Sequence, residues 1–232
     1  RQDRRGVRGV ERVAEERLRG RRGTVTAYLD HRPDKRNEPV DGEDVLLSID
    51  HDLQKSIYDL LGDRVRAAAM VPGGSVVVLD IPTREVLALV SYPSYDPAEW
   101  NQRYAEMSRD TLRLPHFFRA VSGTYQPGSI VKPMTIVAAH AGGIVYEHTT
   151  HECRWALFPN KTEGRRRHCW VWPSAHGPLH SEQALIQSCN IFCFQVGEQL
   201  GVDGLCSWLK MAGFGQFSGT ELPADRKGVL PE

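Results

Sequence analysis

The hydrophobic pattern in the first part of the chain predicts a helix followed by a β-hairpin. The apolar run 45–49 predicts a short strand, and Asp50 follows as the N-cap of a helix that we expect to end near Gly62. Two further apolar runs, 75–80 and 85–90, flank a short turn and are typical of a hairpin. Because both runs are almost continuously apolar, we expect a sheet that is covered on both faces.

The later part of the chain alternates between irregular and helical patterns. Residues 91–128 are rich in proline and aromatic residues and predict mostly irregular structure. Residues 129–141 predict a buried helix that two consecutive glycines close. A second irregular stretch, 147–180, precedes three helical patterns, at 181–187, 190–200 and 203–211.

Composition limits the class of protein. With 232 residues, 41% of them hydrophobic, the chain is long enough for one core, or for a core and part of a second domain. Its 29 basic residues balance its 29 acidic ones, so we expect no nucleic-acid partner. No apolar run approaches the roughly 18 residues that span a bilayer, so we expect any membrane anchor to lie outside this chain.

The strongest chemical motif opens the helix predicted at 129–141. Ser129 and Lys132 are three residues apart, so their side chains share one face of a helix. A serine hydroxyl needs a neighbouring base to become a nucleophile, and a partly desolvated lysine can serve as that base. Free backbone N–H groups at the start of the helix would face the oxygen on which charge develops. This geometry suits acyl transfer.

A second motif, Ser188-Cys189-Asn190, falls at a predicted junction between two helices. Ser-x-x-Lys followed by Ser-x-Asn belongs to the motif set of penicillin-binding proteins and serine β-lactamases. The stretch from Arg119 to Pro133 also resembles the sequence around the nucleophile of class B penicillin-binding proteins. Further landmarks match in order, at 74–80, 91–97 and 213–223.

This resemblance implies a fold, a reaction and partners. The expected fold is α/β (α+β), the transpeptidase fold of penicillin-binding proteins and serine β-lactamases, with an antiparallel sheet flanked by helices. The implied activity is that of a serine-type peptidoglycan D,D-transpeptidase, which needs no catalytic cofactor and which β-lactams inhibit. Ser129 would be acylated by a stem peptide ending in D-alanyl-D-alanine and Lys132 would accept its proton, while Ser188 and Asn190 would relay protons and hold the substrate amide.

The resemblance also implies a place in the cell. His176-Gly177 is similar to an element of elongation-type members, whose expected partners are a shape-determining glycosyltransferase and its regulators. We therefore expect the protein to lie on the periplasmic side of the inner membrane. Residues 1–40 would be the end of a non-catalytic pedestal and 41–232 the transpeptidase domain. Because no Lys-Thr-Gly or Lys-Ser-Gly triplet follows Ser188, we expect this domain to be truncated before that motif.

Two alternative functions stay open. A serine β-lactamase or β-lactam sensor would share the chemistry of Ser129 and Lys132, but the pedestal-like start and the long 147–180 segment disfavour it. A non-catalytic scaffold of the cell-wall synthesis complex would not need Ser129, Lys132, Ser188 and Asn190 together.

A cysteine and histidine cluster suggests a metal site. Cys153, Cys169, His176 and Cys189 offer three thiolates and an imidazole, the ligands of a closed structural zinc site. A Cys153–Cys169 disulfide and buried inert thiols are the alternatives. Cys193 and Cys206 lie among apolar neighbours and are predicted core residues. Trp155, Trp170 and Trp172 could line a groove for a glycan or a partner, but packing of a long loop is the favoured interpretation.

Overall fold

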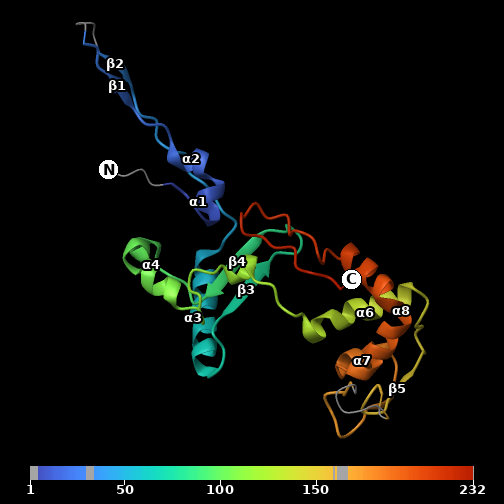
Figure 1. Cartoon of the computed structure of the whole chain (residues 1–232). Coiled ribbons are helices and arrows are strands. Elements are labelled where there is room, and N and C mark those ends of the chain that lie inside the picture. Colours follow the sequence, from blue (N-terminus) through green and yellow to red (C-terminus); the bar gives the residue numbers. More distant parts are fainter. Residues whose placement is uncertain (1–4, 30–33, 159, 161–166, 232) are drawn as a thin grey trace. The chain divides into compact units, whose positions relative to one another are not determined.

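The computed structural model describes residues 5–29, 34–158, 160 and 167–231. The chain divides into two compact units, each with its own contacts (Figure 1). Unit 1 comprises Arg1–Gly123 and Gly219–Arg226, and unit 2 comprises Thr124–Ser218 and Lys227–Glu232. These units are defined by contacts between residues, so the functional boundary predicted at residue 40 stays a prediction.

Unit 1 is built on the predicted hairpin. Strands β3 (Gly74–Leu79) and β4 (Val86–Tyr92) pair antiparallel, which confirms that prediction. Helices α3 (His51–Ala67) and α5 (Arg119–Ser122) contact both strands, and Ala88 and Val90 of β4 are buried. Val77 and Leu79 of β3 are exposed, however. Residues two apart in a strand share a face, so one face of β3 is open and the expectation of two covered faces is wrong there.

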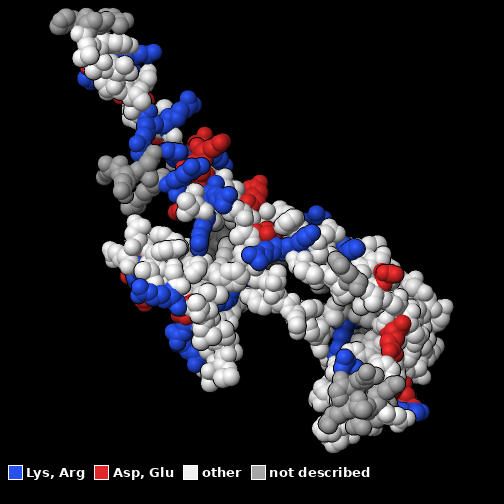
Figure 2. All heavy atoms as spheres, viewed as in Figure 1, with Lys and Arg blue, Asp and Glu red and all other residues white. Residues whose placement is uncertain are grey.

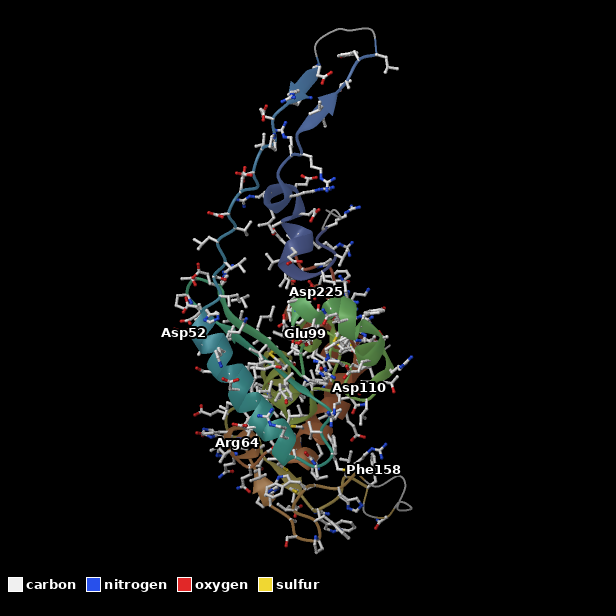
Figure 3. The ribbon with its side chains drawn as sticks, turned by 90° about the vertical axis from the view of Figure 1, so that its left-hand side faces the viewer. Asp52, Arg64, Glu99, Asp110, Phe158 and Asp225 are labelled. Carbon is white, nitrogen blue, oxygen red and sulfur yellow. The ribbon has the colours of Figure 1, made fainter. Side chains whose placement is uncertain are left out.

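Helix α3 begins where the sequence predicted. The side chain of Asp50 accepts hydrogen bonds from the backbone N–H groups of Asp52 (3.0 Å) and Leu53 (2.9 Å), which satisfies two free donors of the first turn. Asp52 lies in the first turn and Arg64 near the last, an order that complements the helix dipole (Figure 3).

The predicted end of this helix at Gly62 is wrong. The helix continues to Ala67, and Gly62 is a buried interior residue that faces β4. A Cβ atom at this position would lie 2.8 Å from Cε2 of Tyr92. The glycine is therefore explained by close packing of a ring against the helix, which its sequence position alone does not reveal.

The strand predicted at 45–49 is absent. Two hydrogen bonds join this segment and Asp50 to β4, from Ser48 Oγ to the carbonyl of Val86 (2.8 Å) and from Asp50 N–H to the carbonyl of Leu87 (2.9 Å). Leu46 is almost fully exposed. Without a ladder or a buried face, the apolar residues do not form a strand.

The irregular structure predicted for 91–128 is partly wrong, because a 3-10 turn η1 (Pro97–Glu99) and helix α4 (Trp100–Arg109) lie there. Arg103 pairs with Glu99 and Glu106 (both 3.1 Å), one turn before and after it. Met107 is the one buried residue of α4. Trp100, Tyr104 and Met107 lie at helical spacing, so the sequence held an apolar stripe that the prolines around it obscured. Glu99 and Asp110 mark its two ends in Figure 3.

The start of the chain forms two short helices and a small hairpin. These are α1 (Gly9–Val13), α2 (Glu15–Arg19), and the antiparallel strands β1 (Thr24–Thr26) and β2 (Lys35–Asn37). Basic and acidic side chains intermingle on the visible face (Figure 2), which agrees with the balanced composition. None of the helices in the described ranges combines the length and apolar content needed to cross a membrane.

Unit 2 packs three helices around a buried core. The 3-10 turn η2 (Gly128–Val131) leads into α6 (Lys132–Ala141), and strands β5 (His151–Cys153) and β6 (Gly177–Leu179) pair antiparallel before α7 (Ser181–Ile186) and α8 (Asn190–Met211). Helices α6, α7 and α8 contact one another. The predicted helices are therefore confirmed, with the last two joined across a kink at Gly201. Their shared core includes Ile136, Val145, Ala184, Ile191, Phe192 and Val196.

Candidate active site and metal centre

The proline and glycine before Ser129 set the entry to α6. Gly128 has φ +58°, a backbone conformation that a residue with a Cβ atom adopts only at a cost. Ser129 follows on η2 and is exposed, whereas Lys132 is the first residue of α6 and only 8% exposed. The Ser129 hydroxyl makes no hydrogen bond to any residue that the structure describes.

The side chain of Lys132 reaches the second motif. Its Nζ donates to the carbonyl oxygen of Ser188 (2.6 Å), to Ser188 Oγ (2.9 Å) and to Asn190 Oδ1 (2.7 Å). More than fifty residues separate these partners in sequence, so tertiary packing brings them together. All three partners are neutral oxygens, and no described carboxylate forms an ion pair with Lys132.

The junction between α7 and α8 aims the second motif at Lys132. Ser188 has φ +48°, which is strained for a residue with a side chain, and its N–H donates to the carbonyl of Leu185 (3.0 Å). Asn190 then opens α8. The turn thus directs one backbone carbonyl, one hydroxyl and one amide oxygen at a single amine.

One contact of this cluster has no signature in the sequence. Asn190 Nδ2 donates to the backbone carbonyl of His168 (3.3 Å), on the loop that carries the cysteine cluster. Both halves of the Asn190 amide are therefore engaged, by Lys132 and by His168. Because any residue supplies a backbone carbonyl, the type of residue at position 168 gives no clue to this contact.

The arrangement can support proton transfer. An amine, a hydroxyl and an amide converge within hydrogen-bonding distance, and Ser129 lies one helical turn before the amine. The structure thus brings together Lys132, Ser188 and Asn190, while Ser129 is placed near them by the helix and not by a hydrogen bond. The catalytic roles of these four residues stay predictions.

The four predicted metal ligands also converge. The ligand atoms of Cys153, Cys169, His176 and Cys189 all lie within 4.8 Å of one another, and the three thiols are buried. Cys169 Sγ is 3.5 Å from His176 Nδ1 and 3.9 Å from Cys189 Sγ. A tetrahedral zinc site has edges of about 3.6 Å between sulfur and nitrogen and about 3.8 Å between two sulfurs. These two separations fit those edges. Both Cys153 and Cys169 are free thiols, so no disulfide joins them.

The surroundings of the thiols differ. Burial raises the pKa of Cys189 to about 12. Burial acts in the same direction on Cys169, but backbone N–H groups of Asn190, Val171 and Ile191 point at its sulfur and lower its pKa. Backbone donors of this kind stabilise a thiolate, the form of cysteine that binds a metal.

Burial was expected of the two remaining cysteines and of the tryptophans, and the structure shows it for the cysteines only. Cys193 and Cys206 are buried, which confirms them as core residues. Burial raises the pKa of Cys193 to about 11, as expected of an inert thiol. Trp170 and Trp172, in contrast, are exposed, so the interpretation that they pack a long loop is wrong for both.

One protein family matches most of the chain. The model of the penicillin-binding protein transpeptidase domain matches residues 74–232, more than half of the chain. The chain belongs to the penicillin-binding protein transpeptidase family.

Similar proteins place the chain more closely within this family. It is 34% identical to peptidoglycan D,D-transpeptidase MrdA of Escherichia coli K12 and 31% identical to the MrdA of Acinetobacter baumannii, over 97% of this chain in both cases. The chain spans about a third of the length of these relatives, 36% and 34%. Among solved structures, PBP2 of Pseudomonas aeruginosa in complex with WCK 5153 is similar, with a TM-score of 0.76 and 28% identity over 97% of this chain and 47% of that one.

A further solved structure supports the fold alone. PBP2 of Helicobacter pylori in complex with MreC has a TM-score of 0.80 and 23% identity, over 98% of this chain and 42% of that one.

Proposed function

We propose that the protein is a peptidoglycan D,D-transpeptidase that cross-links stem peptides through an acyl-enzyme on Ser129. The observation that carries the proposal is the convergence of Lys132, Ser188 and Asn190 one helical turn from Ser129. The family match and the MrdA relatives support the same reaction.

The first half of the reaction makes an ester. Ser129 Oγ attacks the carbonyl carbon between the last two D-alanines of a stem peptide, and Lys132 Nζ accepts the serine proton. The C–N bond then breaks, and Ser188 Oγ delivers a proton to the leaving amine of D-alanine and receives the proton that Lys132 Nζ holds. Asn190 holds the amide of the substrate, for which it would exchange its hydrogen bond to the carbonyl of His168.

The second half makes the cross-link. The amine of a neighbouring stem peptide attacks the ester carbonyl and loses a proton, which returns to Ser129 as the serine leaves. A new amide bond replaces the D-alanyl-D-alanine bond, and no external energy source is needed. β-Lactams acylate the same serine, but the amine that ring opening frees stays attached to the acyl group. No leaving group departs, so the ester persists.

Intact-mass spectrometry of the full-length protein with a reporter penicillin tests the proposal. The wild type should gain the mass of one penicillin, Ser129→Ala should gain none, and Ser207→Ala, a change on an exposed face of α8, should behave like the wild type. An adduct that persists for hours fits a transpeptidase, whereas one that is hydrolysed within seconds indicates a β-lactamase. A folded wild type without any adduct would favour the scaffold function.

We also propose that the four-residue cluster binds a structural zinc ion. The four ligand atoms lie within 4.8 Å of one another, the separations from Cys169 to His176 and to Cys189 match the edges of a tetrahedral site, and three backbone N–H groups favour a thiolate at Cys169. Cys189 lies inside the Ser188–Asn190 motif, and His168, which contacts Asn190, precedes Cys169. The ion would hold the loop of β5 and β6 against α8 and take no part in the chemistry.

The substrate sets the expected location and partners. Peptidoglycan lies in the cell envelope, so we propose that the protein acts there, on the periplasmic side of the inner membrane and beside a shape-determining glycosyltransferase. The family match begins at residue 74, which is compatible with a pedestal in residues 1–40 that precedes the transpeptidase domain.

A further inference from the structure

Two tryptophans stand exposed beside the candidate active site. Trp170 is 65% exposed and Trp172 is 55% exposed, although they lie one and three residues after the buried Cys169. Each indole presents a large apolar surface to solvent, and exposed apolar surface close to an active site can serve in binding. We call these two side chains the tryptophan platform.

Trp170 is fixed next to the second motif. Its Nε1–H donates to the backbone carbonyl of Gln187 (2.9 Å), the residue that precedes Ser188. Its ring lies 5.9 Å from the ring of His176, between centroids. One edge of the indole is therefore anchored while most of its surface stays open.

Trp172 is connected to Asn190 by a second route. Its ring packs edge-on against the ring of His168, with centroids 5.3 Å apart, and Trp155 lies 5.7 Å away from the same imidazole. The carbonyl of His168 accepts the hydrogen bond from Asn190. Trp170 is thus bonded to the residue that precedes Ser188, and Trp172 is connected through His168 to Asn190.

We propose that the tryptophan platform is a subsite for the saccharide that carries the stem peptide. This inference rests on the proposed function and adds a substrate contact to it. Sugar rings present flat C–H faces that pack on exposed indoles, and they need no charged partner. Residues 167–180 contain no aspartate or glutamate, so a ligand bearing an ammonium group would find no carboxylate here.

The length of the stem peptide agrees with this placement. Four residues of the pentapeptide stem separate the sugar from the scissile bond, and they span at most about 14 Å when fully extended. Trp170 contacts the residue before Ser188, and Ser188 Oγ is 2.9 Å from Lys132 Nζ. A donor whose scissile bond lies at Ser129 therefore carries its sugar within reach of the platform.

The test compares two donors on the full-length protein. One is a synthetic stem pentapeptide ending in D-alanyl-D-alanine, and the other is the same peptide on its N-acetylglucosaminyl-N-acetylmuramyl disaccharide. The rate of D-alanine release, with a D-amino acid as acceptor, gives kcat/KM for each donor. The variants are Trp172→Leu, Trp172→Phe and, as a matched control, Tyr146→Leu, which removes another exposed aromatic ring of unit 2.

The wild type should prefer the disaccharide donor by about tenfold, through KM, as expected for stacking on two indoles. Trp172→Leu should reduce the preference to about twofold, with the larger loss of kcat/KM falling on the disaccharide donor. Trp172→Phe should keep most of the preference, and Tyr146→Leu should keep all of it.

Two results would overturn the inference while leaving the proposed function intact. The first is equal use of both donors by a wild type that releases D-alanine. The second is a loss in Trp172→Leu that affects both donors equally and lowers Tm, which would show that the indole packs against protein. If neither donor yields D-alanine and no penicillin adduct forms, the proposed function itself fails.

Discussion

Replacing Lys132 with methionine tests the proposed proton acceptor. Methionine has a similar length and fills the same buried space, but it has no N–H donor and cannot accept a proton at physiological pH. The change therefore removes the base and leaves the carbonyl and hydroxyl of Ser188 and the amide oxygen of Asn190 without their shared donor.

The structure gives the size of the expected effects on the acylation rate and on stability. General base catalysis contributes about 10²–10⁴ to a rate, so acylation of Ser129 should slow by that factor. Ser188 and Asn190 are half-buried, so water reaches them and their lost hydrogen bonds together cost about 1–3 kcal/mol. Removal of a buried amine offsets part of this cost, so Tm should fall by about 10 °C at most.

The assay follows acylation by a fluorescent penicillin in the full-length protein, with Tm measured in parallel. Lys210→Met is the matched control, because Lys210 is exposed in the last turn of α8 and has no contact with the site. It should acylate at the wild-type rate. If folded Lys132→Met acylates within about threefold of the wild type, Lys132 is not the base and the role assigned to it is wrong.

Three further predictions concern the metal centre and the fold. Elemental analysis should find one zinc ion in the purified wild type and in Cys206→Ser, and none in purified Cys189→Ser. A wild type that contains no zinc, although it was purified without metal loss, would contradict the site. Gly62→Ala should lower stability by about 1–3 kcal/mol in urea denaturation, because the new Cβ meets Tyr92, and a gain in stability would refute the packing argument. Asp50→Ala should lower stability by about 1 kcal/mol through loss of the N-cap and leave penicillin acylation unchanged.

Local patterns that depend on neighbouring residues could be predicted well. The cap at Asp50, the β3–β4 hairpin and the helices of unit 2 all follow from hydrogen bonds or side-chain periods within short segments. Predictions failed where a pattern needed a distant partner to interpret it. Gly62 resembled a helix end because the ring of Tyr92, thirty residues later, was invisible in the sequence. Helix α4 failed for another reason: Trp100, Tyr104 and Met107 lie at helical spacing, but the prolines of residues 91–128 favoured irregular structure.

The sequence by itself determined the reactive residue types and their short spacings: Ser129 with Lys132, Ser188 with Asn190, and the cysteines with His176 as candidate ligands. Only the tertiary structure decided that Lys132 contacts Ser188 and Asn190, that four ligand atoms converge, and that Trp170 and Trp172 face solvent. The physical reason is one of range. Turn and helix geometry act over a few residues, whereas burial and contacts between distant segments exist only once α6, α7 and α8 pack around a common core.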